Sequence, residues 1–243
     1  MANQTEETGV SLFEQLNAIH TSGRMPTNIR GIIQQKRWQR EKHDSGVYYG
    51  APDDPNHMGR YNDPTAKTGV CFTADYAVTA IAESYGREYH KKPKEFFIGS
   101  DEVSKAQMCT LQTTRETTTI DMVRLQAILH ITADKTMGDD QSITQAVTEW
   151  AANTPGLPYD GVTYVSRHLG VGTCTAYWQR EGEEGPLKDV DMIPLDKYID
   201  DDKQNFPQGW TYPDIDGFEI LTETLNFTVV SNNSEEDEED EED

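Results

Sequence analysis

The chain is poor in cysteine, and it lacks any long run of apolar residues. Its three cysteines, Cys71, Cys109 and Cys174, form no Cys-x-x-Cys pair, which excludes the common zinc modules and favours a reducing compartment. No stretch approaches the roughly 20 apolar residues that span a bilayer, and the N-terminal residues are too polar for a secretion signal. The six histidines are scattered without metal-ligand spacing. We therefore expect a cytoplasmic protein with no membrane contact and no bound metal.

Positive charge is also scarce. The chain has 43 acidic against 21 basic residues and a net charge of −22. Such a surface repels phosphate backbones, so we expect no nucleic-acid partner. Part of the charge lies in an unbroken acidic run from Glu235 to Asp243. Residues 231–243 are therefore predicted to be a disordered tail. The sequence leaves open whether this tail aids solubility, binds a basic partner or shields a basic cleft.

The rest of the sequence alternates between helical and strand patterns. Ser11 and Glu14 predict a capped helix over Val10–Ile19. Segment 218–230 is typical of one or two late strands. Further helices are predicted over 75–85 and 142–152, and further strands over 69–73, 108–111, 161–166 and 174–179. This mixture predicts an α+β fold in which a mixed β-sheet core is flanked by helices.

We divide the chain into an N-terminal helical extension (1–44), a main domain (45–230) and the acidic tail (231–243). Basic residues are concentrated between Arg30 and Lys42, around Trp38. A solvated helix face explains this cluster, and a partner or phosphate site is the alternative.

Two charged residues and a serine are candidates for a site. Arg60 follows Gly59, and its planar guanidinium suits a bidentate bond to phosphate. Glu83 lies among alanines on the helix predicted over 75–85, so it requires a partner or a function. An ion pair between Arg60 and Glu83 alone would explain both residues. Ser166 ends an alternating strand, where it is either a small packing residue or part of the same site.

Aromatic residues near these positions could bind the rings of a substrate. Tyr49, Tyr61 and Phe72 are the candidates, and packing in the core is the alternative for each.

Taken in order, these segments resemble the RES domain family, whose name comes from an arginine, a glutamate and a serine. The resemblance covers roughly residues 45 to 180. It rests on Gly59-Arg60-Tyr61-Asn62-Asp63-Pro64, Cys71-Phe72-Thr73-Ala74, Thr79-Ala80-Ile81-Ala82-Glu83, Tyr159-Asp160-Gly161-Val162-Thr163-Tyr164-Val165-Ser166-Arg167 and Thr173-Cys174-Thr175-Ala176-Tyr177-Trp178.

The resemblance implies a fold similar to ADP-ribosyltransferases and a cleft for NAD⁺. By position, Arg60 would hold the phosphates, Glu83 would act at the nicotinamide ribose, and Ser166 would line the pocket and bond substrate. Tyr61 and Phe72 would contact substrate. Phe72 stands where the family often has tyrosine, so a neighbour such as Tyr49 would have to supply that hydroxyl.

One further position departs from the family pattern. An arginine often found in the first strand is missing beside Tyr48-Tyr49. Arg30 and Arg40 are the candidates to replace it.

The activity implied is cleavage of the nicotinamide–ribose bond of NAD⁺ by a glycohydrolase or an NAD⁺ phosphorylase, in a toxin of a toxin–antitoxin pair. NAD⁺ would be the substrate, phosphate the alternative acceptor to water, and an antitoxin protein a partner, with a homo-oligomer left open. Transfer of ADP-ribose to a protein is one alternative. A non-catalytic nucleotide-binding or structural module is the other.

Overall fold

A single mixed sheet organises the chain, for which the computed structural model describes residues 10–170, 172–200, 206 and 214–231. The 8-stranded sheet has the order β1-β6-β7-β8-β3-β2-β5-β9, and only β6 and β7 are parallel neighbours within it. Its strands are β1 (Thr27–Arg30), β2 (Gln34–Gln39), β3 (Thr68–Ala74), β5 (Gln107–Thr113), β6 (Thr117–Asp121), β7 (Gly161–Val165), β8 (Thr173–Arg180) and β9 (Leu187–Pro194).

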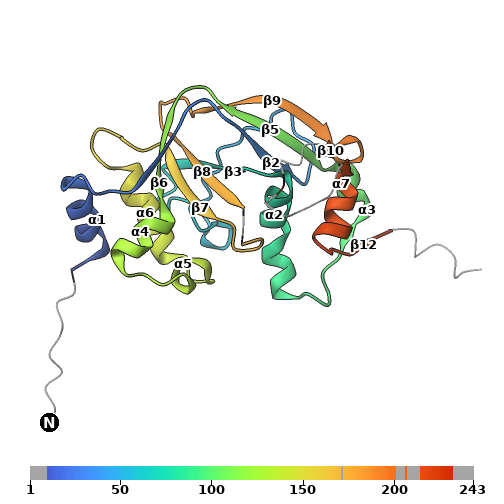
Figure 1. Cartoon of the computed structure of the whole chain (residues 1–243), viewed down its shortest axis with the longest axis horizontal. Helices are drawn as coiled ribbons and strands as arrows, with labels where there is room; N and C mark the ends of the chain where they lie inside the picture. Colours follow the sequence, from blue (N-terminus) through green and yellow to red (C-terminus); the bar gives the residue numbers. More distant parts are fainter. Residues whose placement is uncertain (1–9, 171, 201–205, 207–213, 232–243) are drawn as a thin grey trace, which may run out of the picture.

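The longer helices lie beneath the arch of this sheet (Figure 1). Helix α2 (Ala77–Lys91) packs against β2, β3 and β8, while α4 (Met122–Leu129) and α6 (Ser142–Ala152) pack against β7. Helix α1 (Leu12–Thr21) packs on α6. The main hydrophobic core lies between these helices and the sheet. The predicted fold class is therefore confirmed as α+β, with a mixed sheet flanked by helices.

The opposite face of the sheet carries a second, smaller hydrophobic cluster. It contains Cys71, Cys109, Leu111, Tyr177 and Leu187, and Val47 and Tyr49 pack against it. All three cysteines are buried and unbridged.

Short elements complete the described chain. Strand β4 (Ile98–Gly99) pairs in parallel with β12 (Val229–Val230), and β10 (Ile199–Asp200) pairs with β11 (Ile215–Asp216). The others are α3 (Ser100–Lys105), α5 (Asp134–Met137), α7 (Gly217–Glu219), the 3-10 turns η1 (Pro55–His57) and η2 (Leu195–Lys197), and the π-helical turn η4 (Ile220–Thr224).

Several local predictions hold. Helix α1 begins after Ser11, whose hydroxyl accepts from the N–H of Glu14, while the Glu14 carboxylate accepts from the N–H of Ser11. The strands and helices expected within 69–85, 108–111, 142–152 and 161–179 are also present.

Two local predictions are wrong. The basic segment after Arg30 forms β2 instead of a helix, because β5 pairs with it from Gln34 to Gln39. Segment 218–230 begins as helix instead of strand, because Asp216 and Glu219 form a reciprocal capping box.

Strands β1 and β2 come from the first 44 residues, yet they belong to the same sheet as strands from 45–230. The boundary at residue 44 stays a prediction. The acidic tail lies outside the described residues from position 232 onward.

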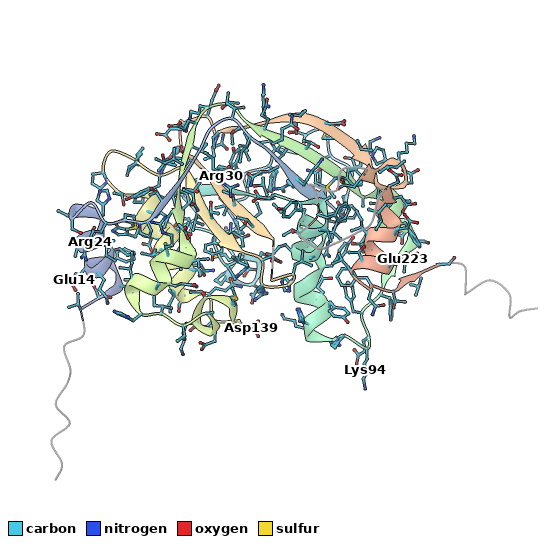
Figure 2. All side chains as sticks on the ribbon, viewed as in Figure 1. Glu14, Arg24, Arg30, Lys94, Asp139 and Glu223 are labelled. Atoms are coloured by element: carbon cyan, nitrogen blue, oxygen red, sulfur yellow. The ribbon has the colours of Figure 1, made fainter. Side chains whose placement is uncertain are left out.

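Strands β2 and β3 diverge in the middle of the sheet. Within the described residues, Lys36 and Ala74 are the one pair in register between the two strands. Just beyond it, Asp75 accepts hydrogen bonds of 2.8 Å from Arg30 and from Gln35; Arg30 is labelled at the arch in Figure 2. The bond from Gln35 joins β2 to the end of β3, and the bond from Arg30 joins β1 to the same carboxylate. At the other end, β2 and β3 leave room for a cavity.

Candidate active site

A cavity of about 310 Å³ opens where β2 and β3 diverge, and α2 forms another of its walls. Its volume is at the lower end of the range of small-molecule sites. The side chains that line it come from segments far apart in sequence. They include Lys36, Arg37, Trp38, Arg60, Tyr61, Phe72, Glu83, Gln141, Tyr164, Arg167, His168 and Cys174.

Arg60 and Glu83 form an ion pair within this cavity. Nη2 of Arg60 lies 3.4 Å from Oε2 of Glu83, and the two side chains are 8% and 21% exposed. Nη1 of Arg60 donates to the carbonyl of Thr136 at 3.4 Å. Burial opposes the charge of Arg60, but the neighbouring Tyr164, Tyr61 and Glu83 raise its pKa overall. Both members of the predicted charged pair therefore line one cavity and contact each other.

The other oxygen of Glu83 is held by the chain after β7. Oε1 accepts 2.7 Å from the hydroxyl of Ser166 and 3.1 Å from the backbone N–H of Arg167. Hydrogen bonds from an O–H and an N–H donor fix the orientation of the carboxylate oxygen that accepts them. The carboxylate is thus fixed in position by donors from three residues on two loops and cannot rotate without losing them.

Ser166 lies behind Glu83 and does not line the cavity. Its side chain is completely buried, and its oxygen also accepts from the N–H groups of His168 and Leu169, at 3.3 and 3.1 Å. A hydroxyl with these contacts orients the carboxylate and the loop. The structure therefore brings Ser166 to the site through Glu83, whereas the sequence had suggested direct contact with substrate.

Stacked aromatic rings form a further wall. Tyr61 and Tyr164 stack with ring centroids 4.3 Å apart, and the guanidinium of Arg60 lies 5.5 and 5.0 Å from these two rings. Burial raises the pKa of both tyrosines, so both are neutral near pH 7. Phe72 lines the same cavity. Tyr164 was missed by sequence reasoning, although its inward position on the alternating strand 161–166 could have revealed it.

Tyr49 is not brought to this cavity. Its hydroxyl accepts a 3.2 Å hydrogen bond from the N–H of Leu187, and its ring packs against the smaller cluster on the other face of the sheet. Tyr49 therefore does not belong to the candidate site.

Two cations of the basic segment on β2, for which a phosphate site was the alternative interpretation, also belong to this cavity. Lys36 and Arg37 line the cavity. Nη1 of Arg37 donates to Sγ of Cys71 at 3.1 Å, and Nζ of Lys36 donates to the hydroxyl of Thr110 at 3.0 Å. Burial lowers the pKa of Lys36, while the charges of Asp200 and Asp191 act in the opposite direction. Neither cation has a carboxylate within ion-pair distance among the residues that the structure describes.

The two arginines named as replacements for the missing early-strand arginine are paired elsewhere. Arg30 is paired with Asp75 at 2.8 Å and Arg40 with Glu88 at 2.9 Å, and neither lines the cavity. Arg37 does line the cavity. It lies beside Trp38 in the basic segment for which the sequence indicated a helix face.

The cavity reverses the charge balance of the chain. The lining includes the cations Lys36, Arg37, Arg60 and Arg167, with Glu83 as the carboxylate, although acids outnumber bases 43 to 21 overall. A cavity lined mainly by cations favours an anionic ligand, because it attracts the opposite charge. The acidic surface outside the cavity repels anions, so we expect anion binding to concentrate in the cavity.

No cluster of His, Cys, Asp or Glu that could hold a metal ion occurs in the described ranges. No helix within those ranges is long and apolar enough to span a membrane.

A comparison with protein families gives one match. A family model described as RES domain matches residues 52–196, which include Arg60, Glu83 and Ser166. Strand β2, with Lys36 and Arg37, precedes the matched range but forms a wall of the same cavity. No match was found among curated proteins or among solved structures.

Proposed function

This chain belongs to the RES domain family, and from that premise we propose that it is an enzyme that cleaves the nicotinamide–ribose bond of NAD⁺. Water or phosphate would be the acceptor, and the products would be nicotinamide and ADP-ribose or ADP-ribose 1″-phosphate. Because many members of this family are toxins of toxin–antitoxin pairs, the proposal includes an antitoxin protein as a partner.

The observation that carries the proposal is the fixed carboxylate of Glu83. Donors from Arg60, Ser166 and Arg167 hold it at the wall of a cationic cavity. Pre-organised charge of this kind stabilises a transition state that develops the opposite charge, because no reorganisation is needed during the reaction. Cleavage of NAD⁺ develops positive charge on the ribose, next to which a carboxylate is favourable.

The chemistry requires no strong acid. As the bond between ribose C1′ and the pyridinium nitrogen breaks, its electron pair moves to that nitrogen, and nicotinamide leaves as a neutral molecule. Glu83 would stabilise the cationic ribose, and an oxygen of water or phosphate would then bond to C1′. An attacking water would release one proton to the solvent.

The remaining lining would bind the rest of NAD⁺. Arg60 and the β2 cations Lys36 and Arg37 suit the diphosphate, because guanidinium and ammonium groups bond phosphate oxygens. Phe72 and the stacked pair of Tyr61 and Tyr164 offer aromatic surface to the rings. Ser166 would act by positioning Glu83.

The direct test is product identification. The purified chain is incubated with NAD⁺ in the presence and absence of phosphate, and products are analysed by mass spectrometry. Free ADP-ribose supports hydrolysis, and ADP-ribose 1″-phosphate supports phosphorolysis. Label from NAD⁺ on protein would instead support protein ADP-ribosylation.

One variant tests the site, and a second variant on the same helix is its control. Glu83→Gln should release no nicotinamide, whereas Glu88→Gln, on the same helix but with a 55% exposed side chain, should match the wild type. Equal nicotinamide release by Glu83→Gln and wild type would reject the assignment of the site. Binding of NAD⁺ without release of nicotinamide by the wild type would favour the non-catalytic module.

A further inference from the structure

His168 and Arg167 are neighbours whose side chains bond each other. Nε of Arg167 donates to Nε2 of His168 at 3.0 Å. A guanidinium N–H can only donate, so Nε2 must carry a lone pair. The geometry therefore assigns the neutral tautomer of His168 with its proton on Nδ1.

The imidazole of His168 is held in place by helix α2. A Cβ added at Gly86 would overlap Cγ and Nδ1 of His168, so the ring lies directly against the helix backbone. On another side it stacks on His90, with ring centroids 5.1 Å apart and an interplanar angle of 20°. The glycine permits a close approach that any other residue would block.

Arg167 connects this ring to the candidate active site. Its backbone N–H donates to Oε1 of Glu83 at 3.1 Å, and its Nη1 donates to the carbonyls of Met137 and Gly138 at 3.1 and 3.3 Å. Both Arg167 and His168 line the cavity. The guanidinium is thus fixed at a cavity wall by two carbonyls on one side and by an imidazole on the other.

We infer that His168 is a positioning residue that holds the Arg167 guanidinium ready to bind the diphosphate of the substrate. This inference rests on the proposed function for the identity of the substrate. A glycine at position 86 is then required for this role, because a side chain there would overlap the imidazole of His168.

The ionisation of His168 agrees with this role. Burial, followed by the charges of Arg167, His90 and Arg60, lowers the pKa of His168 from 6.5 to about 3. A second proton would have to go on Nε2, where it would face the Arg167 cation and remove the acceptor. Near neutral pH the imidazole therefore keeps its lone pair for Arg167.

The first experiment separates binding from chemistry. His168→Ala should raise both the Kd for ADP-ribose, measured by calorimetry, and the KM for NAD⁺ by about tenfold, the lower end of the range for one lost bond to a charged group. The kcat should change little, because Glu83 keeps its donors. His168→Gln, whose Oε1 can accept from Arg167, should recover most of the affinity. Unchanged affinity in His168→Ala, or equal losses in both variants, would overturn the inference.

The second experiment uses Gly86. Gly86→Ala should raise KM as much as His168→Ala does, although alanine is the better helix former. The double variant Gly86→Ala/His168→Ala should lose no more than either single variant, because both act through one contact. Additive losses would contradict the assigned role of the glycine.

A third measurement does not depend on any ligand. Nitrogen-15 NMR of the wild type should show His168 as the neutral Nδ1–H tautomer down to about pH 4, and His168→Ala should speed exchange of the Arg167 Nε–H. Protonation of His168 near its ordinary pKa would overturn the inference even if NAD⁺ is the substrate. If the wild type neither binds ADP-ribose nor consumes NAD⁺, the proposed function fails, and the NMR result alone decides whether His168 holds Arg167.

Discussion

The hydroxyl of Ser166 donates a 2.7 Å hydrogen bond to Oε1 of Glu83, across 83 positions of sequence. This contact joins the loop after β7 to helix α2 and makes the serine a support for the carboxylate. The same hydroxyl accepts from two backbone N–H groups of its own loop, so loop and carboxylate are positioned together.

Ser166→Ala should therefore reduce activity without abolishing it. Loss of one hydrogen bond to a charged group is worth about 1.5–3 kcal/mol, which corresponds to roughly a 10- to 150-fold fall in kcat for nicotinamide release. The free energy of unfolding should fall by about 1–3 kcal/mol, because two partly buried N–H groups lose their acceptor. Ser104→Ala, on the exposed side of α3, is the control and should leave both quantities unchanged. A Ser166→Ala variant with no measurable turnover would instead indicate direct chemistry at the hydroxyl.

Arg60→Ala should destabilise the fold and also abolish the release of nicotinamide. Arg60 is 8% exposed and faces a partly buried carboxylate, and removing one member of a buried pair leaves the other uncompensated. We expect a loss of about 3 kcal/mol in the free energy of unfolding, measured by urea titration. Arg124→Ala, where the arginine is 65% exposed, should cost less than about 0.5 kcal/mol. Equal stability of Arg60→Ala and wild type would contradict the buried ion pair.

Arg37→Ala tests the contribution of β2. We expect the KM for NAD⁺ to rise by about 10- to 100-fold with little change in kcat, because the lost contact binds phosphate equally before and during the reaction. Arg37→Lys should recover part of the loss, since it keeps the charge without the planar donors. The exposed Arg24→Ala provides the matched control. A fall in kcat at constant KM would show that Arg37 acts on the reacting atoms instead.

The pKa of His168 makes stability depend on pH in a predictable direction. The folded value of about 3 lies below the ordinary value of 6.5, so between these limits the unfolded chain binds a proton that the folded chain does not. This residue therefore makes stability rise with pH in that window, by at most about 1.4 kcal/mol per pH unit. His168→Gln lacks this dependence, so the stability advantage of the wild type should shrink between pH 7.5 and pH 4.5 in urea titrations. An advantage that is equal at both pH values would contradict a buried neutral imidazole.

Local sequence signals were sufficient for much of the fold. The capping box of Ser11 and Glu14 predicted the start of α1, and the apolar strand over 69–73 predicted most of β3. These elements were recognisable because their stabilising contacts are close in sequence. The residue order Arg60, Glu83 and Ser166 likewise indicated the family that the RES domain match confirms.

Two elements were misread for different physical reasons. Residues 34–39 have no clear apolar alternation, and they become a strand because β5 pairs with them across 68 to 78 positions of sequence. Segment 218–230 was misread because its strand-like alternation outweighed the capping box at Asp216. The first error could be corrected only by knowing a partner that is distant in sequence, and the second by giving more weight to the local capping signal.

The sequence by itself determined the α+β class and the candidate pair of Arg60 and Glu83, because short-range patterns and residue order carry that information. Only the tertiary structure decided that Ser166 supports Glu83, that Tyr49 lies on the other face of the sheet, and that Lys36 and Arg37 join the cavity. The physical reason is that a side chain's direction depends on strand register and on where two strands separate. In this protein β2 separates from β3 beyond Lys36 and Ala74, and the cavity opens at that point.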